Sequence, residues 1–470
     1  MDGHECSEVL ISELDFSTRL DAEYYQKIHL NYKHKVENLP HKYLSNVANF
    51  LIGPFGSAYD TSNYVDIPDY RYVRGQDVKP FELLETSPRY IAKEDYERLS
   101  KYALIPGDIL VSVVGTIGNT CIVREKDVPG IFSCKSTVIR TKNINPYYLT
   151  CYLNSKYGKS LLVRQERGAI QKGLNLDDLK AVIVPEFSDS FQLMFETLLK
   201  DVELLQDKSN RSFTKAEEML LARIGIDMSA ITNGGVSVKS FTESFGSTGR
   251  LDAEYYQPKY DDFENHVLNY SEGCTTPGDE FELVKTKCSR ELTEYPYVEI
   301  GDIDIGNGSS EYNVVATENL PANAKIMTQK GDLLISTVRP YRGAVSILNK
   351  DNLLVSGAFT VLREKGTYPA QTLQVLFRTS LYKDWLLKFN VGTSYPVIKD
   401  DDILQIPIPL LDESMHNRIK EFIQKSQLLL SASKQLLECA KRAVEMAIEQ
   451  DETTAQSWLE SKISDLTKEE

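Results

Sequence analysis

The C-terminal part of the chain carries a heptad pattern of apolar residues. From Met415 to Gln450, apolar pairs recur every seven residues, and no Gly or Pro interrupts them. The pattern predicts a helix of about 36 residues, which is about 50 Å long at 1.5 Å per residue. A less regular pattern in the same phase, from Leu198 to Leu220, predicts a second long helix, although Ser209 and Ser212 interrupt it. The C-terminal pairs are Phe422-Ile423, Leu429-Leu430, Leu436-Leu437 and Ala443-Val444.

Short β-rich runs precede each predicted helix. Two of them follow a Gly-Asp turn signal and alternate apolar residues, and two others end in a proline, which cannot donate to a neighbouring strand. Many Tyr, Gly, Asn and Pro residues lie between these runs and indicate irregular loops. Each set predicts a compact α+β domain. The runs are DILVSVV at 108–114, DLLISTV at 332–338, AVIVP at 181–185 and QIPIP at 405–409.

The chain contains an internal repeat. The octapeptide RLDAEYYQ occurs at Arg19–Gln26 and again at Arg250–Gln257. Further along, Gly107 and Gly331 are 224 positions apart (331 − 107), and the terminal prolines of the two sets keep the same spacing. A shared frame with different residues between the markers is typical of a duplicated unit whose scaffold is kept while its working surface differs.

A chain of 470 residues is too long for one ordinary core, and the markers predict its division. We expect an N-terminal repeat segment at 1–39, a first domain at 40–185, and a central long helix at 186–225. A linker with the second repeat segment is expected at 226–279, a second domain at 280–409, a C-terminal long helix at 410–450, and an acidic tail at 451–470.

The net charge of −15 argues at first against a nucleic-acid partner. Residues 40–185, however, hold 19 Lys and Arg against 15 Asp and Glu, and residues 280–409 hold 14 against 16. The acidity therefore collects outside the two domains. Because phosphate contacts need only a local basic face, DNA remains a possible ligand of the domains, although binding by this chain alone should be weak.

Several classes are disfavoured by the sequence. No apolar run approaches the roughly 18–20 residues of a membrane helix, and Met1–Leu10 is too polar for a signal peptide. The seven cysteines form no CxxC pair, which disfavours a disulfide framework or a zinc site and favours a reducing cytoplasm. No Asn/Asp-Pro-Pro-aromatic motif and no phosphate-binding glycine motif is present, which disfavours an amino-methyltransferase or nucleotide-binding site in this chain. GTIGNT at Gly115 is interpreted as a strand-turn-strand feature, and Asp177-Asp178 and Asp400–Asp402 as turn or cap residues.

These motifs resemble, in order and over about residues 9–450, the specificity subunit of a type I restriction-modification system. The octapeptides, the Gly-Asp-led strands at 107–112 and 331–336, the following helices and GPFGSAY at Gly53–Tyr59 carry the resemblance. It implies an α+β fold with two target-recognition domains related by internal duplication. It also implies that two long helices, packed as an antiparallel coiled coil, separate the domains.

The resemblance further implies a non-catalytic function. Each domain would read one half of an asymmetric bipartite double-stranded DNA target, and the helices would fix the spacing between the halves. Two copies of a methyltransferase subunit would dock, and a motor-nuclease subunit would join them. No cofactor is expected in this chain, whereas S-adenosylmethionine, ATP and magnesium are expected on the partner subunits. The octapeptides would lie where the two identical partners bind, through Arg19, Tyr24, Tyr25, Arg250, Tyr255 and Tyr256.

Polar residues on glycine-rich or aromatic loops are the candidate DNA readers. Arg and Gln match the guanine and adenine edges in the major groove through paired hydrogen bonds. A surface salt bridge or a loop hydrogen bond is the competing interpretation for each residue. The candidates are Ser57, Tyr59, Arg71, Arg74, Gln76, Gln171 and Lys172 in the first domain, and Arg339, Tyr341, Arg342, Thr393, Ser394 and Tyr395 in the second.

Two other functions stay open. The chain could be a coiled-coil scaffold whose α+β domains bind proteins rather than DNA. It could also be a modification enzyme that contains its own methyltransferase, which the missing motifs strongly disfavour.

Overall fold

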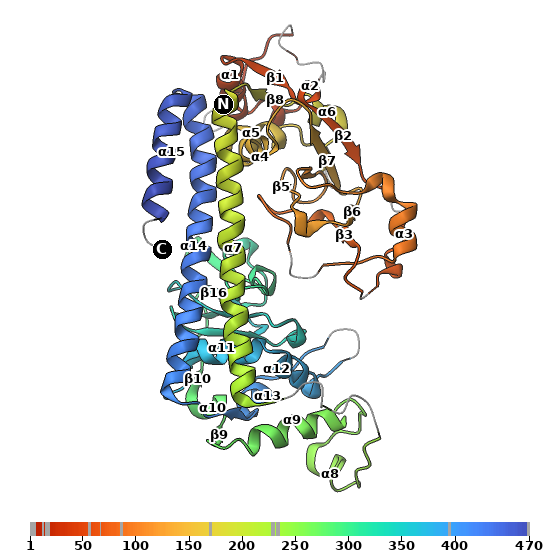
Figure 1. The fold of residues 1–470 in the computed structure, drawn as a ribbon, viewed down its shortest axis with the longest axis vertical. Helices are drawn as coiled ribbons and strands as arrows, with labels where there is room; N and C mark the ends of the chain where they lie inside the picture. The colour runs from red at the N-terminus through yellow and green to blue at the C-terminus, as the bar shows by residue number, and fades with distance from the viewer. Residues whose placement is uncertain are drawn as a thin grey trace. The chain divides into compact units, whose positions relative to one another are not determined.

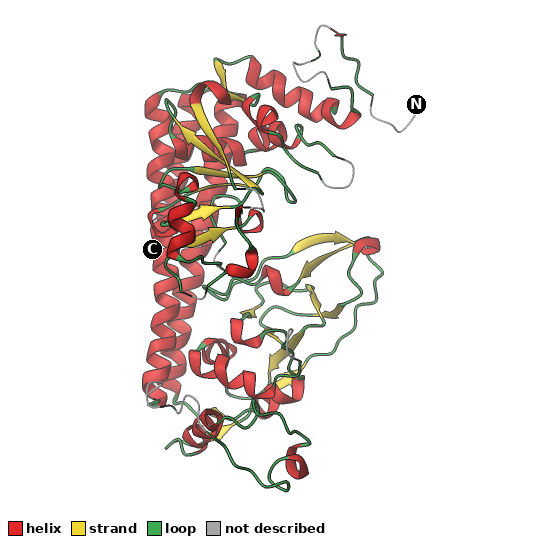
Figure 2. Cartoon of the chain, turned by 90° about the vertical axis from the view of Figure 1, so that its right-hand side faces the viewer, coloured by secondary structure: helices red, strands yellow, loops and turns green. Residues whose placement is uncertain are grey.

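The computed structural model describes residues 6–11, 14, 19–54, 58–65, 67–84, 88–168, 172–226, 231, 236–392 and 396–467. The chain forms two compact units: Met1–Leu205 with Ser431–Glu470, and Gln206–Leu430. Each unit combines strands with helices, as the α+β class requires (Figure 2). Over the described ranges, every helix is too short or too polar to span a membrane.

The first unit contains a domain whose two ends are joined by a strand pair. β1 (His41–Tyr43) pairs antiparallel with β8 (Ile183–Pro185), and His41 lies opposite Pro185. We refer to residues 41–185 as domain 1. The helices η2 (Ala22–Tyr25) and α1 (Lys27–Glu37) precede it.

The main sheet of domain 1 has four antiparallel strands in the order β2-β7-β4-β5. Its central strand β4 is buried along its whole length, which explains its apolar run. A parallel pair of strands, β3 and β6, forms a second small sheet. The strands are β2 (Ala48–Ile52), β3 (Arg71–Val73), β4 (Ile109–Ser112), β5 (Thr120–Ile122), β6 (Gly130–Phe132) and β7 (Ser136–Thr141).

Short helices complete domain 1. Asn145 and Ser155 cap the N-termini of α4 and α5 with their side chains, so two helices follow one another with no long loop between them. The helices are α2 (Leu44–Val47), η4 (Thr61–Asn63), η5 (Gly75–Asp77), α3 (Lys93–Arg98), η6 (Ser100–Tyr102), η7 (Glu125–Asp127), α4 (Pro146–Asn154), α5 (Lys156–Val163) and α6 (Leu176–Lys180).

The second unit has the same plan. β9 (Cys274–Thr275) pairs with β18 (Ile408–Pro409), and Cys274 lies opposite Pro409. This pairing begins before Glu280, where the sequence places the start of the domain, and we refer to residues 274–409 as domain 2. Its main sheet has the antiparallel order β10-β17-β14-β15, and a second sheet has the order β12-β11-β16-β13. β11 and β16 pair in parallel, as β3 and β6 do in domain 1.

The strands of domain 2 are β10 (Phe281–Leu283), β11 (Glu294–Val298), β12 (Asn313–Ala316), β13 (Ala324–Met327), β14 (Leu333–Ser336), β15 (Val345–Ile347), β16 (Leu354–Ser356) and β17 (Phe359–Glu364). The helices of the unit are α8 (Phe245–Thr248), α9 (Pro258–Leu268), α10 (Pro277–Glu280), η8 (Ile300–Asp302), η9 (Thr317–Asn319), η10 (Pro340–Arg342), α11 (Ala370–Arg378), α12 (Ser380–Trp385), η11 (Leu386–Phe389) and α13 (Asp400–Gln405). β14 lies 224 positions after β4, so the repeat in the sequence corresponds to the same strand in each sheet.

The two predicted long helices are present as α7 (Asp189–Ile224) and α14 (Glu413–Glu449). In the second unit they lie side by side (Figure 1), and their polar residues join them. Ser209 donates to the carbonyl of Ser426 at 2.8 Å, and Ser212 donates to the carbonyl of Phe422 at 2.9 Å. The serines that interrupt the heptad pattern in the sequence therefore lie in the helix contact, because a small side chain lets the two backbones approach.

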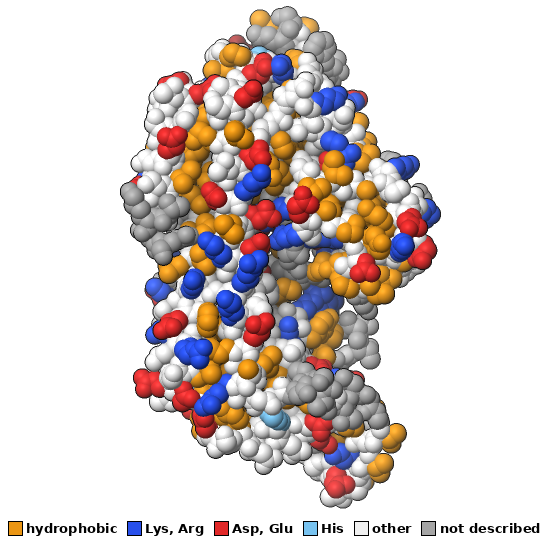
Figure 3. All heavy atoms as spheres, viewed as in Figure 1, with side chains coloured by type: hydrophobic (Ala, Val, Ile, Leu, Met, Phe, Trp, Pro, Cys, Tyr) orange, Lys and Arg blue, Asp and Glu red, His pale blue; other side chains and the backbone are white. Residues whose placement is uncertain are grey.

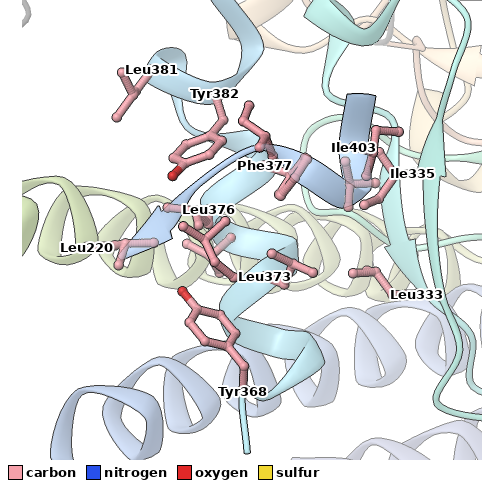
Figure 4. Packing of buried hydrophobic residues seen from close by; sticks show 14 of the residues in the cluster. Leu220, Leu333, Ile335, Tyr368, Leu373, Leu376, Phe377, Leu381, Tyr382 and Ile403 are labelled. Atoms are coloured by element: carbon pink, nitrogen blue, oxygen red, sulfur yellow. The ribbon is translucent and has the colours of Figure 1, made fainter. Parts of the chain in front are cut away.

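The apolar face of the helices also forms a wall of each domain core. In the second unit, Leu220 of α7 and Ile419 of α14 belong to one cluster with Leu373 and Phe377 of α11. Figure 4 labels Leu220, Leu373 and Phe377 in this cluster. In the first unit, the Phe195 ring lies 5.8 Å from the ring of Tyr148 on α4. The long helices are therefore part of the domain cores and not independent spacers, because their buried side chains pack against the domains.

The segment expected as an acidic tail at 451–470 is helical over most of its length. Residues Glu452–Thr467 form helix α15, in which Ala455 and Leu459 are fully buried. The Asp451 side chain accepts from the Thr454 amide at 2.8 Å and caps this helix. The capping residue and the i, i+4 apolar pair were the available signals, and the high acidity of the segment hid them.

We predict that Leu436→Asp destabilises the protein by about 3–5 kcal/mol, because it buries an unpaired carboxylate and leaves a cavity. Leu436 is 1% exposed, whereas Leu428 on the same helix is 69% exposed. Leu428→Asp is therefore the matched control and should change the free energy of unfolding by less than about 0.5 kcal/mol. Urea denaturation of both variants measures the two changes in the free energy of unfolding. Equal effects would show that the face of α14 that carries Leu436 is not its buried face.

Candidate nucleic-acid interface

Three loops of domain 1 lie against one another. We call them the capping loop (74–83), the turn loop (113–119) and the glycine loop (167–174). The Asn119 side-chain amide in the turn loop donates to the carbonyl of Val78 in the capping loop at 3.2 Å. The turn loop and the glycine loop are joined by a bridge between Val114 and Gly173, and the Leu174 amide donates to the carbonyl of Val113 at 2.9 Å.

Domain 2 brings together the three equivalent loops: the capping loop (299–310), the turn loop (337–343) and the glycine loop (391–398). Val338 bridges to Val397, and the Arg339 amide donates to the carbonyl of Pro396 at 2.8 Å. Arg378 joins the capping loop to the turn loop, since it donates to the carbonyls of Ile305 and Gly343. RPYRG and GTSYP, which the sequence proposes separately as reading loops, thus belong to adjoining loops.

The two turn loops differ at a conformationally special position. Gly115 has a φ of +87°, and Arg339, which is 224 positions later, has a φ of +50°. Left-handed backbone suits glycine and is uncommon for a side chain such as that of arginine. Arg339 thus has a backbone conformation that glycine adopts at the equivalent position of domain 1.

The predicted readers of domain 2 lie on the turn loop. Tyr341 is exposed, and Arg339 and Arg342 are half-buried. Arg342 lies at the last position of η10, with its backbone amide bound to the carbonyl of Arg339. Thr393, Ser394 and Tyr395 lie outside the described residues, as do Ser57 and Gln171 of domain 1.

The capping and glycine loops of domain 1 carry the other predicted readers. Gln76 is exposed on η5. Arg74 is half-buried, and its guanidinium donates to both carboxylate oxygens of Asp77, at 3.0 and 2.7 Å. Lys172 is exposed, and its ammonium lies 3.0 Å from a carboxylate oxygen of Glu166. Gln76 and Lys172 are thus the residues of this set with the greatest access to a ligand.

Tyr59 and Arg71 have internal contacts, which favours the competing structural interpretation for both. Tyr59 is 4% exposed, its ring lies 5.2 Å from that of Tyr72, and burial raises its pKa to about 12. Arg71 is 7% exposed and donates to Asp127 at 2.9 Å and to the carbonyl of Leu84 at 2.8 Å. Arg71 begins β3, whose parallel pairing with β6 buries it, and its local sequence does not indicate that long-range pairing.

The sequence reasoning missed the turn loop of domain 1. GTIGNT was interpreted as a connection between strands, and it does join β4 to β5. It is nevertheless the equivalent of RPYRG, and Gly115 and Thr116 are exposed at its tip. The constant spacing of 224 was the signal that would have found it, because it pairs Gly115 with Arg339.

The two octapeptides form the same intramolecular clasp. Arg19 bonds Asp21 at 2.7 Å and donates to the carbonyls of Gln165 and Glu166 at 2.9 and 2.7 Å. Arg250 bonds Asp252 at 2.8 Å and donates to the carbonyls of Phe389 and Asn390 at 3.1 and 2.7 Å. These two carbonyls lie 224 positions after those of Gln165 and Glu166. The arginine in each clasp lowers the pKa of its aspartate through these hydrogen bonds. Each clasp therefore fastens the start of the repeat to the glycine-loop side of its own domain.

The tyrosines of the octapeptide complete the clasp. The guanidinium carbon of Arg19 lies 4.7 Å from the ring centre of Tyr24, and that of Arg250 lies 4.6 Å from Tyr255. Tyr25 and Tyr256 donate to the carbonyl of their own arginine, Arg19 or Arg250, at 3.0 and 3.2 Å. The two copies thus make the same set of internal contacts, and partner binding by these residues stays a prediction.

A pocket opens beside each clasp. In the first unit it has a volume of about 200 Å³ and is lined by Tyr24, Arg164 and Asp178. In the second unit it has a volume of about 890 Å³ and is lined by Tyr255, Lys388 and Asp402, which are the equivalent residues by the 231 and 224 spacings. Equivalent residues therefore line a hollow beside each octapeptide, although the two hollows differ in volume.

The acidic pairs have the structural roles that the sequence predicts. Asp178 lies in the first turn of α6 and accepts from Arg167 at 2.6 Å. Asp402 accepts from the backbone amide of Lys399 at 2.7 Å and caps α13. Among the residues whose positions are described, no three His, Cys, Asp or Glu side chains gather as metal ligands would.

Comparison with known proteins supports the resemblance carried by the motifs. No protein-family model matches the chain. A stretch of 122 residues is 33% identical to the type I restriction enzyme EcoBI specificity subunit of Escherichia coli. The match spans 26% of this chain and 26% of that relative, about a quarter of each. The predicted similarity to type I specificity subunits is thereby confirmed.

Two solved structures are also similar over most of the chain. The S subunit of a type I restriction-modification system from M. genitalium aligns over 87% of this chain and 95% of its own, with 12% identity and a TM-score of 0.39. The HsdS subunit from Thermoanaerobacter tengcongensis aligns over 87% and 96%, with 15% identity and a TM-score of 0.28. Because both TM-scores are below 0.5, the case for function rests on the sequence match and on the geometry described above.

We predict that Arg19→Met destabilises the first unit by about 3 kcal/mol, since it removes buried charge-assisted hydrogen bonds to two carbonyls. The same change at Arg250 should cost less, because the Arg250 side chain is 21% exposed, against 6% for Arg19. Amide hydrogen exchange during a urea titration resolves the two units. Equal and negligible effects in both would contradict the clasp.

Proposed function

We propose that this chain is the non-catalytic DNA-recognition subunit of a type I restriction-modification complex, which works in the cytoplasm. One observation carries the proposal beyond the sequence match. Two domains whose main sheets have the same strand order each bring three loops together, while the residues on those loops differ. A scaffold kept in duplicate with different loops suits a protein that reads two different sequences with one architecture.

Each domain reads one half of a bipartite target in double-stranded DNA. The differing turn loops support this division. Domain 1 has Gly115 and Gly118 where domain 2 has Arg339 and Arg342. Arginine presents paired donors to guanine, whereas a glycine tip brings only backbone to the bases. The two half-sites therefore differ, and the whole target is asymmetric.

The long helices set the distance between the half-sites as an antiparallel coiled coil. Two hydrogen bonds within the second unit support the orientation. Ser209 bonds Ser426, and Ser212, three residues further along α7, bonds Phe422, which lies four residues earlier in α14. The two helices therefore run in opposite directions at this contact.

Two copies of a methyltransferase subunit dock on this scaffold, and a motor-nuclease subunit joins that assembly. The equivalent clasps and pockets at the octapeptides support two identical docking positions. The partner subunits supply S-adenosylmethionine, ATP and magnesium. They also supply part of the affinity for DNA, because Lys and Arg are interspersed with Asp and Glu on the face drawn in Figure 3.

An electrophoretic shift assay tests the proposal. The full chain with a type I methyltransferase subunit should bind, from a pool of randomised duplexes, sequences with two conserved segments separated by unread base pairs. The two segments should differ from one another. Retention of no DNA, with or without the methyltransferase, would contradict the proposal and leave the protein-binding scaffold in its place.

We predict that Arg342→Ala relaxes base preference in one half-site at a cost of about 1–3 kcal/mol, because it removes a pair of donors to a base edge. Gln76→Ala, in the other domain, should relax the other half-site. Sequencing of duplexes selected by each variant measures both effects. Tyr312→Phe is the control. Tyr312 is exposed in domain 2 and lies outside the three loops.

If the arginine and glutamine variants select the same sequences as the wild type, these two residues do not read bases.

A further inference from the structure

Each domain has a pair of short helices in equivalent positions: α4 and α5 in domain 1, and α11 and α12 in domain 2. The end of the first helix and the start of the second keep the 224 spacing, so Asn154 corresponds to Arg378 and Lys159 to Lys383. These four side chains lie next to the turn loops. They are candidates for residues that shape the loops without touching a ligand.

In domain 1 a lysine joins the turn loop to the capping loop. The Lys159 ammonium donates to the carbonyl of Ile117 and to the side-chain oxygen of Asn119, both at 3.1 Å. The same Asn119 amide group donates onward to Val78 in the capping loop at 3.2 Å. Lys159 thus holds one loop directly and the second through Asn119.

In domain 2 an arginine joins the same two loops directly. Arg378 is 4% exposed and donates to the carbonyl of Gly343 in the turn loop at 3.2 Å and to that of Ile305 in the capping loop at 2.7 Å. Its guanidinium carbon also lies 4.3 Å from the ring centre of Phe213 on α7. The arginine therefore connects both loops to the long helix.

The second member of each pair has a smaller share in the contact. Asn154 donates to the carbonyl of Thr120, just beyond the turn loop, at 2.9 Å. Lys383 packs its side-chain carbons near Gly343, where an added Cβ would lie 3.0 Å from its Cδ. Each domain thus places one cation across the two loops, but from different positions of the helix pair.

Charge strengthens these contacts, because hydrogen bonds from a cation are stronger than those from a neutral donor. Burial lowers the pKa of Lys159 to about 8, and it lowers the pKa of Arg378. A lysine with a pKa of about 8 is mostly charged at neutral pH, and arginine is not deprotonated in proteins. Hydrogen bonds to loop oxygens offset the free-energy cost of removing each cation from water. Because those bonds need the loop oxygens in place, they favour one arrangement of the loops.

We propose that Lys159 and Arg378 are positioning residues that fix the turn loop against the capping loop in domain 1 and in domain 2. The inference rests on the proposed function, since it assigns these loops to DNA reading. It adds that base preference in each half-site depends on a cation that contacts no base. The use of different positions in the two domains is one reason why equivalent loops adopt different shapes.

The test compares Lys159→Met, Arg378→Met and Lys383→Met in the full chain with its methyltransferase subunit. Duplexes selected from a randomised pool give the base preference at every position. Lys159→Met should lower the preference in one half-site about tenfold, and Arg378→Met should do so in the other, because each removes charge-assisted hydrogen bonds to its loops. Binding to non-target DNA should stay unchanged, and Lys159→Arg should restore the preference.

Lys383→Met is the matched control, since it keeps the packing at Gly343 and removes an ammonium that makes no loop hydrogen bond in the described part of domain 2. Equal loss of preference in both half-sites, or an effect of Lys383→Met as large as that of Arg378→Met, would overturn the proposal.

Amide hydrogen exchange without DNA separates this inference from the proposed function. Lys159→Met should speed exchange in residues 113–119 about tenfold while the buried strand β4 keeps its protection. Should the wild type select no DNA sequence, the proposed function fails, and this measurement still decides the positioning role. Unchanged exchange in the turn loop would refute it.

Discussion

The buried face of the two long helices is the constraint on which the rest of the structure depends. Ile419 and Ile423 of α14 and Leu220 of α7 are each at most 1% exposed, and they share a core with the sheet and helices of domain 2. Removal of such area from water is the main favourable term in folding. Domain 2 thus packs directly on the long helices. A substitution on the buried face of the helices also affects the loops of domain 2, because both are attached to the same core.

Buried and half-buried cations fasten segments outside the core to each domain. Arg19 and Arg250 use the same hydrogen bonds to fasten the start of each repeat, and their identical sequence reflects identical work. Lys159 and Arg378 achieve a similar result by different means, because the loops that they hold have diverged. Sequence identity therefore marks the scaffold, and sequence difference marks the working surface.

Much of this architecture could be predicted from the sequence, and the limits have physical causes. The heptad pattern located α7 and α14 because helix burial repeats along the chain, and the terminal prolines located β8 and β18. Burial of Tyr59 and Arg71 could not be predicted, since it depends on the pairing of β3 with β6, which are far apart in sequence. Helix α15 was hidden by its acidic composition. The anchoring role of Lys159 depends on contacts with a loop 40 residues earlier in the chain, which no local pattern records.

Each domain is proposed to read one half of the target from a shared scaffold. A chain in which residues 41–185 also replace residues 274–409 tests it most directly, because His41 with Pro185 and Cys274 with Pro409 are the pairings that close the two domains. The measurement is nucleotide-resolution mapping of methylated sites in cells that hold this chain and its methyltransferase subunit. If each domain reads one half-site, the target becomes symmetric, and one half-site of the wild-type sequence appears twice in inverted orientation. Methylation at the unchanged asymmetric target would contradict it.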